Sequence, residues 1–368
     1  MNRFRGKLGL QQRVLPKYRA LFFDLLASAC EGGMSLFAGA PRAVEGIVTT
    51  DRLQVADYHA GRNIHLFSNS LYLCYQAGLL EWLRDLNPEA LIVEANPRYL
   101  STPAAVRWLH AHGRPVLGWG LGGLRFDSGA LSARKSIEGR IWSVFIRQFD
   151  ALIAYSQRGA EEYAALGFPR ERIFVACNSV SAPPSFPPPE RPLTFNLRPT
   201  ILFVGRLQAR KRVDHLLRAC AQLGSNPRLV IIGDGPERER LQSLANEVYP
   251  GAEFIGAKHG AELRPYFMEA DLFVLPGTGG LAVQEAMSYG LPVIVAQGDG
   301  TQDDLVRNEN GWQIPPDNFD ALLATMKEAL SDVARLRRMG NESYRIVKDE
   351  INIEKMVEVF IKAVNTLT

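Results

Sequence analysis

The segment Leu272–Met287 reads LFVLPGTGGLAVQEAM, and this stretch decides the fold of the chain. Its first four residues are apolar without polar alternation, which is typical of a strand buried on both faces, as in a parallel sheet. The glycines after the strand let a ligand approach the backbone, and the residues after them predict a helix over Leu281–Tyr289. A strand, a glycine-rich turn and a helix in this order predict a phosphate-binding turn.

Apolar runs of the same kind recur on both sides of this segment. They are Leu91–Glu94, Pro115–Gly118 and Ala151–Tyr155 in the first half, and Thr200–Val204, Arg228–Ile232 and Pro292–Ala296 in the second. Stretches with apolar residues three and four apart, Val213–Leu223 and Glu237–Val248, predict crossover helices between them. The pattern predicts an α/β fold of two doubly wound, Rossmann-like domains that face a cleft. Functional side chains are then expected directly after the strands.

A proline-rich segment marks the join between the two halves. Seven of the nineteen residues from Ser181 to Pro199 are proline, which fixes φ and lacks an N–H donor. We therefore expect residues 1–182 to form an N-terminal domain, 183–199 an interdomain linker and 200–350 a C-terminal domain. The last stretch, 351–368, is expected to form a helix that returns to the first domain.

Composition excludes several classes of protein. The chain is 46% hydrophobic and 22% charged, as in an average soluble protein, and its net charge is only +3, so nucleic acid is not the expected partner. No apolar window is long enough to span a bilayer, and cations interrupt the basic start, so neither a membrane span nor a secretory signal is expected. The cysteines are too widely spaced for a zinc ribbon or a redox pair, which indicates a cytoplasmic protein: Cys30, Cys74, Cys177 and Cys220.

Charged residues follow the strands of the second half. Four cations lie within seven residues after Thr200–Val204, where fixed positive charge would hold a diphosphate, although such a run is often only solvated: Arg206, Arg210, Lys211 and Arg212. Glu285, one turn into the predicted helix, is either a solvated carboxylate or an acceptor for the hydroxyls of a ribose. Asp234 lies in a turn whose glycines turn chemistry alone explains.

These motifs resemble the nucleotide-sugar domain of the group 1 (retaining, GT-B) glycosyltransferases. The similarity covers Thr200–Leu330 and lies in FVGRL with Lys211, IGDGPE, and GL with EAM and GLPVI. It implies that Arg206 and Lys211 bind the diphosphate of the donor, that loop amides contact phosphate, and that Glu285 holds the ribose. These three are the candidate catalytic residues, and the full donor-binding set is Gly205, Arg206, Lys211, Asp234, Gly277, Thr278, Gly279, Gly280, Leu281 and Glu285.

One position departs from the family. Eight residues before Glu285 the family usually has another glutamate, near the donor sugar, where this chain has Gly277. Either backbone and Thr278 hold the sugar, or the donor differs from that of the commoner members. A weakened or inactive enzyme is the third interpretation.

The first half offers candidates for contact with an acceptor. A first strand over Lys7–Leu10 leads to Tyr18 and Arg19, and the run Leu91–Glu94 leads to further polar residues. The candidates are Tyr18, Arg19, Glu94, Asn96, Arg98, Trp119 and Gly120. Gly118–Gly123 matches G-x-G-x-x-G, but no helix is expected after it, so a loop at the cleft is favoured over a dinucleotide site.

The stretch Ser132–Phe149 combines cations, among them Arg134 and Lys135, with apolar residues. It predicts a basic amphipathic helix, which either lies on an anionic membrane or packs on the sheet.

The sequence therefore indicates a glycosyltransferase of polysaccharide biosynthesis. The resemblance implies transfer from a nucleotide diphosphate sugar to a hydroxyl of a glycan or lipid-linked glycan, with retention, without a metal or other cofactor. The protein is expected in the cytoplasm, with the inner face of the membrane as a possible site. The alternatives are a nucleotide-sugar epimerase of the same fold and a pseudoenzyme that only binds nucleotide sugar.

Overall fold

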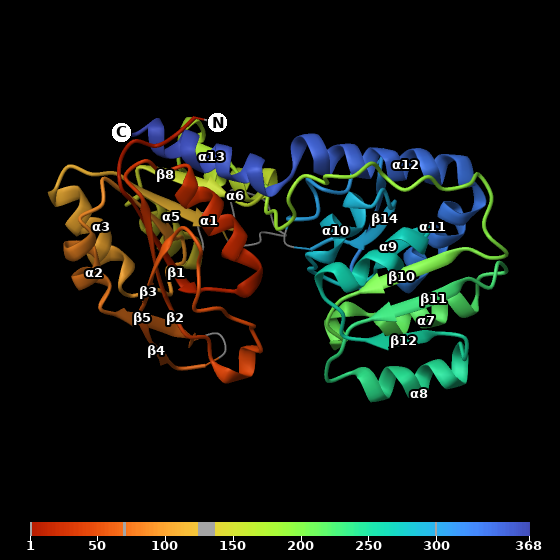
Figure 1. Cartoon of the computed structure of the whole chain (residues 1–368). Helices are drawn as coiled ribbons and strands as arrows, with labels where there is room; N and C mark the ends of the chain where they lie inside the picture. Colours follow the sequence, from red (N-terminus) through yellow and green to blue (C-terminus); the bar gives the residue numbers. More distant parts are fainter. Residues whose placement is uncertain (1, 69–70, 124–136, 299) are drawn as a thin grey trace. The chain divides into compact units, whose positions relative to one another are not determined.

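The computed structural model describes residues 2–68, 71–123, 137–298 and 300–368. The chain divides into two compact units (Figure 1): unit 1 is Met1–Val180 with Ile353–Thr368, and unit 2 is Ser181–Asn352. Each unit is built on a parallel sheet covered by helices, so the prediction of two doubly wound α/β domains is confirmed.

The sheet of unit 2 has the strand order β12-β11-β10-β13-β14-β15, and every neighbouring pair is parallel. Its strands are β10 (Thr200–Val204), β11 (Arg228–Ile232), β12 (Glu253–Gly256), β13 (Leu272–Leu275), β14 (Val293–Ala296) and β15 (Gly311–Ile314). The chain starts in the centre at β10, winds to one edge, and returns to β13 on the other side of β10. This reversal makes the gap between β10 and β13 the topological switch point, where ligands of such sheets bind.

The helices of unit 2 cover both faces of this sheet. They are α7 (Val213–Ala221), α8 (Arg238–Val248), α9 (Arg264–Glu269), α10 (Ala282–Ser288), α11 (Phe319–Ser331) and α12 (Val333–Arg345), followed by the π-helix η7 (Ile346–Glu350). Asn318 and Asp332 begin α11 and α12 as side-chain caps, each accepting a backbone N–H. The helix predicted over Leu281–Tyr289 is one residue shorter at each end.

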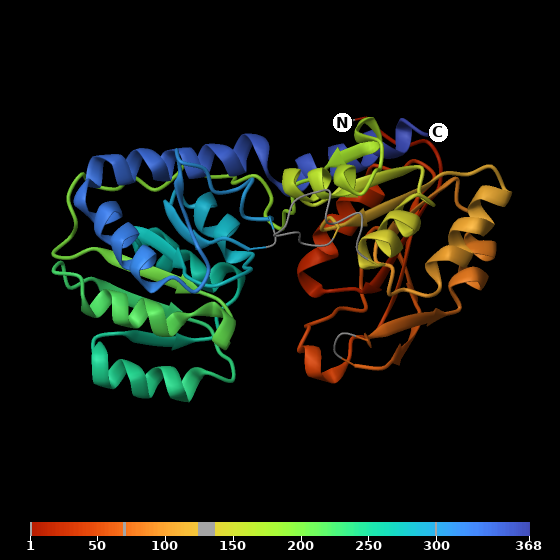
Figure 2. The ribbon, with the colours of Figure 1, turned by 180° about the vertical axis from the view of Figure 1, so that it is seen from behind.

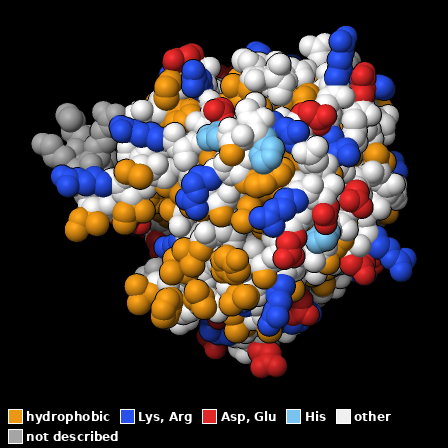
Figure 3. Space-filling model, turned by 90° about the vertical axis from the view of Figure 1, so that its left-hand side faces the viewer, with side chains coloured by type: hydrophobic (Ala, Val, Ile, Leu, Met, Phe, Trp, Pro, Cys, Tyr) orange, Lys and Arg blue, Asp and Glu red, His pale blue; other side chains and the backbone are white. Residues whose placement is uncertain are grey.

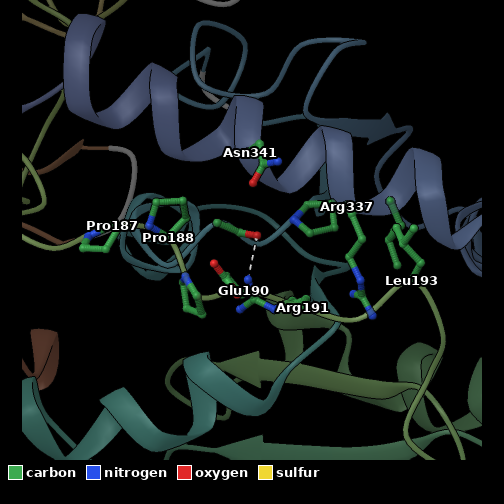
Figure 4. A pocket seen from close by; sticks show the side chains of 11 residues that line it. Pro187, Pro188, Glu190, Arg191, Leu193, Arg337 and Asn341 are labelled. Atoms are coloured by element: carbon green, nitrogen blue, oxygen red, sulfur yellow. Dashed lines mark hydrogen bonds between the residues drawn. The ribbon is translucent and has the colours of Figure 1, made fainter.

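The proline-rich segment packs on unit 2 rather than running freely between the units. The half-buried guanidinium of Arg191 donates to the carbonyl oxygens of Phe267, Ala270, Tyr289 and Gly290 at 2.9–3.1 Å. These carbonyls precede β13 and β14, so the segment closes the amino edge of the sheet. Figure 4 shows the cavity of about 560 Å³ between this segment and α12, which therefore lies at the edge opposite to the switch point.

The sheet of unit 1 has seven parallel strands in the order β3-β2-β1-β6-β7-β8-β9. They are β1 (Leu8–Val14), β2 (Met34–Gly39), β3 (Asp57–Ala60), β6 (Ala90–Glu94), β7 (Val116–Gly120), β8 (Ala151–Ala154) and β9 (Ile173–Val175). The switch point lies between β1 and β6. The first strand runs four residues beyond the predicted Lys7–Leu10, because Gln11 and Gln12 are buried strand residues rather than the start of a loop.

Two groups of helices cover this sheet. On one face α1 (Ala20–Ser28) packs with α13 (Ile353–Asn365), and on the other lie α2 (Leu79–Leu86), α3 (Thr102–Ala111), α5 (Ile137–Ile146) and α6 (Gln157–Ala165). The chain ends lie close together in unit 1 (Figures 1 and 2), where the Asn365 amide donates to the carbonyl of Arg3. The final helix thus belongs to unit 1.

A hairpin of β4 (Arg62–Leu66) and β5 (Leu73–Ala77) lies beside the unit 1 sheet. Its outer face leaves Ile64, Leu66 and Tyr75 partly exposed, and Figure 3 shows hydrophobic side chains gathered low on this side of unit 1. Within the described residues, no helix is both long enough and apolar enough to cross a bilayer.

Candidate functional site

The loops after β10 and β13 meet at the switch point of unit 2. Lys211, only 5% exposed, donates from Nζ to the carbonyl oxygens of Thr278, at 2.8 Å, and Gly279. Arg210 donates to the Thr278 carbonyl at 3.3 Å, and its own carbonyl accepts the Thr278 N–H at 3.2 Å. The cationic loop and the glycine-rich loop are thus fixed to each other around a buried ammonium group, although Lys211 and Thr278 are 67 residues apart in sequence.

Gly277 is the point of closest approach between these loops. A Cβ at this position would lie 2.1 Å from the Arg210 carbonyl oxygen and 2.4 Å from the Lys211 Cα. Only glycine fits there while the cationic loop keeps its place. The backbone of residues 210–211 occupies the space that a glutamate side chain at residue 277 would need. This packing accounts for the glycine at a position where the family usually has glutamate.

Glu285 lies near the start of α10, half-buried beside the same loop. Burial raises the pKa of its carboxyl group from 4.5 to about 7. Among the described residues none donates a hydrogen bond to this carboxylate, whereas its backbone carbonyl accepts from Ser288. A half-buried carboxylate without a protein partner is suited to accept hydrogen bonds from a ligand, which fits the ribose hydroxyls expected from the sequence.

The exchange Glu285→Gln tests whether the carboxylate of Glu285 binds a ligand or has only a structural role. A folded-state pKa above that of the unfolded chain means that stability decreases as pH rises from about 4.5 to about 7. The exchange should therefore raise the melting temperature at pH 8, leave it nearly unchanged at pH 4, and still weaken nucleoside diphosphate binding about tenfold at pH 8.

Calorimetric titration and thermal melts at the two pH values measure both effects. In the wild type, affinity should fall as pH drops below about 7, whereas the variant should lack this step. A lower melting temperature at pH 8 with unchanged affinity would make Glu285 a structural residue.

The remaining donor-side candidates lie along the same sheet edge. Gly205 donates to the carbonyl of Ile232, and a Cβ at Gly233 would lie 1.9 Å from the Gly205 carbonyl oxygen, so close packing explains this turn. Asp234 is exposed and accepts the N–H of Gly235 at 2.7 Å, as expected of a turn residue. Arg206 is exposed at the end of β10, and Gly280 and Leu281 complete the loop before α10.

A cavity that the sequence did not indicate adjoins Gly277 and Thr278. It measures about 420 Å³, and its other lining residues include Arg210, Arg212 and Asp317. Arg212 forms ion pairs with Asp214 and Asp317, so this member of the cationic run is neutralised within the protein. The cations of this run therefore have different surroundings. Lys211 points into the glycine-rich loop, and Arg212 points away from it.

In unit 1 the acceptor-side candidates separate into surface and core residues. Tyr18 is 49% exposed, Arg98 is exposed, and the Asn96 side chain accepts the Arg98 N–H at 3.0 Å. Trp119 and Gly120 differ from the expectation of a loop at the cleft. Both are buried within β7, because Trp119 packs among the aromatic residues under α1 and α13, and a Cβ at Gly120 would meet the Tyr163 hydroxyl at 2.5 Å.

Glu94 and Arg19 lie at the carboxyl edge of the unit 1 sheet, at its switch point. The Glu94 carboxylate accepts the Arg13 N–H at 2.8 Å and the Tyr99 hydroxyl at 3.0 Å, and burial raises its pKa. Arg19 is 5% exposed and donates to Asn178. Both polar groups are thus held by unit 1 itself.

Comparison with known proteins agrees with this geometry. Residues 190–346 match the family described as glycosyl transferases group 1, and residues 23–179 match the glycosyl transferase 4-like domain. A GDP-mannose-dependent alpha-mannosyltransferase of Mycobacterium tuberculosis is 36% identical over 164 residues, and the sulfoquinovosyl transferase SQD2 of Arabidopsis thaliana is 36% identical over 117. These alignments span 42% and 31% of this chain, and only 42% and 22% of the relatives' lengths.

Two solved structures share the fold over nearly the whole chain. The lipopolysaccharide outer core galactosyltransferase WaaB has a TM-score of 0.69 at 19% identity, with 98% of this chain and 100% of that chain covered. The Anabaena protein Alr3699/HepE in complex with UDP has a TM-score of 0.70 at 15% identity, with both chains fully covered. With a GT-B fold and family matches in both halves, the chain belongs to the group 1 glycosyltransferases.

Proposed function

We propose that this protein transfers a sugar, with retention of configuration, from a nucleotide diphosphate sugar to a hydroxyl group of a glycan or lipid-linked glycan. The observation that supports it most is the buried ammonium group of Lys211 at the unit 2 switch point, fixed to the loop between β13 and α10. A buried cation at that position is suited to hold a diphosphate.

The transfer needs stabilisation of the leaving group. As the bond from the anomeric carbon to the diphosphate breaks, negative charge builds up on the phosphate oxygen, and Lys211 and Arg206 would stabilise it. Since α10 has only seven residues, its dipole adds little, and the loop amides of Gly279 and Gly280 with the two cations would supply the binding. We propose that these fixed charges make a metal ion or other cofactor unnecessary, so that activity persists in excess chelator.

An assay of nucleoside diphosphate release tests the proposal. GDP-mannose is the first donor to try, because mannosyltransferases that depend on it are among the relatives, and UDP-glucose is the second, because HepE has been solved in complex with it. Release that requires an added acceptor would exclude both the epimerase and the pseudoenzyme. The coupling constant of the anomeric proton in the product then tests retention, and an inverted product would contradict that part.

We further propose a cytoplasmic protein that binds the inner face of the membrane through α5. Arg134 and Lys135, on which the sequence-based expectation rested, lie outside the described residues. Within the described part, α5 buries Phe145 and Ile146 against the sheet, and leaves a second apolar stripe exposed between cations. This face consists of Ile137, Ile141 and Val144, with Arg140 and Arg147.

Sedimentation with anionic vesicles at low salt measures this binding. Arg140→Glu with Arg147→Glu should abolish it, since each cation near such a surface contributes about 1 kcal/mol. The matched control is Arg84→Glu with Arg107→Glu on α2 and α3, which should still sediment. If the wild type stays in the supernatant, the membrane proposal is wrong and a soluble acceptor is favoured.

A further inference from the structure

Gln284 is a buried side chain that joins α10 to both ends of unit 2. It is 2% exposed and lies next to Glu285 in the first turn of the helix. Its Oε1 accepts the backbone N–H of Ser181 at 3.2 Å, and its Nε2 donates to the backbone carbonyl of Ile351 at 2.7 Å. Ser181 is the first residue of unit 2, and Ile351 is the last but one. One amide group therefore holds a residue at each place where the chain passes between the units.

The second of these places is an irregular break between two helices. The π-helix η7 follows α12, and the N–H of Ile351 closes its last turn by donating to the carbonyl of Ile346 at 2.8 Å. The side-chain amide of Asn352 donates to two further carbonyls of this turn, each at 3.0 Å, before α13 begins. π-helical turns are rare and are frequent at functional sites. Gln284 thus holds the residue that closes this π-helical segment, residues 346–352.

The chain that leads into unit 2 also holds the other end of α10. Arg191, in the same proline-rich segment, donates to the carbonyls of Tyr289 and Gly290 directly after the helix. Because α10 has only seven residues, these contacts and those of Gln284 fix it at both ends. Successive side chains on a helix point about 100° apart, so Gln284 faces the interior while Glu285 lies beside the glycine-rich loop. The turn that carries Glu285 is therefore positioned through Gln284.

We infer that Gln284 is a positioning residue of the donor site, through which the two ends of unit 2 set the affinity for the donor nucleotide. A displacement of Ser181 or of the π-helical segment moves the first turn of α10, and with it the Glu285 carboxylate and the amides of the glycine-rich loop. The coupling is reciprocal by linkage, so the nucleotide also stabilises both ends of the unit. The inference rests on the proposed function in one respect, namely that Glu285 and this loop bind the nucleotide.

Hydrogen–deuterium exchange of the full chain without any ligand tests the coupling directly. Lys211→Ala loosens the glycine-rich loop, and it should speed exchange of the amides in residues 346–352 by about fivefold or more. Gln284→Met keeps the size of the side chain and removes both hydrogen bonds, so Lys211→Ala should have little effect on this segment in that background. Equal acceleration in both backgrounds, or no acceleration in the wild type, would overturn the inference.

A pair of variants outside α10 guards against damage to the helix itself. Ser181→Ala keeps the backbone N–H that Gln284 accepts, whereas Ser181→Pro removes it. Both lack the serine hydroxyl, so the loss of the hydroxyl cancels when the two are compared. Relative to Ser181→Ala, Ser181→Pro should accelerate exchange in α10, residues 282–288, by about fivefold or more. Equal exchange of α10 in the two variants would contradict the inference.

Calorimetric titration with GDP and UDP then measures the effect on the donor site. For the nucleotide that the wild type binds, Gln284→Met should raise the Kd by about fivefold or more. Gln222→Met changes an exposed glutamine of the same unit and is the matched control, for which we expect an unchanged Kd. A Gln284 that only stabilises the fold would lower the melting temperature of the variant and leave the Kd unchanged well below that temperature, which would overturn the inference.

The outcomes separate this inference from the proposed function. If neither nucleotide binds the wild type, the donor-site proposal fails, and the exchange experiments without ligand still decide whether Gln284 couples the loop to the ends of unit 2. If a nucleotide binds equally well to the wild type, Gln284→Met and Ser181→Pro, the donor site stands and the inference is wrong. With an active acceptor in hand, Gln284→Met should raise the KM for the donor and leave the KM for the acceptor unchanged.

Discussion

Replacing Lys211 by alanine is expected to reduce kcat/KM for the donor by about a hundredfold or more, equivalent to about 3 kcal/mol of lost transition-state stabilisation. Two effects combine. The ammonium group proposed to stabilise the leaving diphosphate is removed, and the carbonyls of Thr278 and Gly279 lose a donor that helps to fix the glycine-rich loop. Arg206→Ala should have a loss of similar size, although Arg206 is exposed rather than buried.

Steady-state kinetics with the identified donor measure both variants. Lys327→Ala, on the exposed side of α11, is the matched control and should behave as the wild type. The two variants should also differ from each other in stability, since only Lys211→Ala removes the side chain that joins the cationic loop to the carbonyls of Thr278 and Gly279. Kinetics within threefold of the wild type for both would contradict the assignment of the diphosphate site.

The sequence predicted the strands best where they are buried on both faces. The bounds of β10, β11 and β13 agree with the predicted runs, because an uninterrupted Val, Ile and Leu run suits only such a position. The sequence did not predict the buried strand residues that are polar. Gln11 donates to Gln76 inside unit 1, and Gln76 donates to Asn63, so amide side chains satisfy each other across β1 and the hairpin. No local pattern shows that partner groups are present.

The candidate site, like the strands, could be predicted only where a local sequence pattern reveals it. Motif spacing identified Lys211 and the glycine-rich loop, since both follow strands that meet at the switch point. The burial of Trp119 depends on α13, which comes from the other end of the chain. The binding of Arg191 to four carbonyl oxygens depends on loops about 80 to 100 residues away, so the sequence showed its segment only as an interdomain linker. Contacts that are distant in sequence decide these features.

The exchange Gly277→Glu tests the meaning of the missing glutamate. It restores the residue that the family usually has at this position, and a view based on sequence alone expects it to leave activity unchanged or raise it. The structure predicts the opposite. The new Cβ would lie 2.1 Å from the Arg210 carbonyl oxygen and must displace the backbone of residues 210–211, and with it Lys211. Overpacking of this kind costs about 1–3 kcal/mol.

We therefore expect Gly277→Glu to lower the melting temperature by about 4 °C or more and to reduce donor turnover by more than about tenfold. Gly277→Ala should have most of the same effect, because the clash begins at Cβ rather than at the carboxylate. Gly224→Ala is the matched control, since a Cβ there meets nothing within 4 Å. If Gly277→Glu instead kept wild-type stability and turnover, the contact between the two loops would not be required. The absence of a carboxylate at residue 277 would then be a matter of donor choice and not of packing.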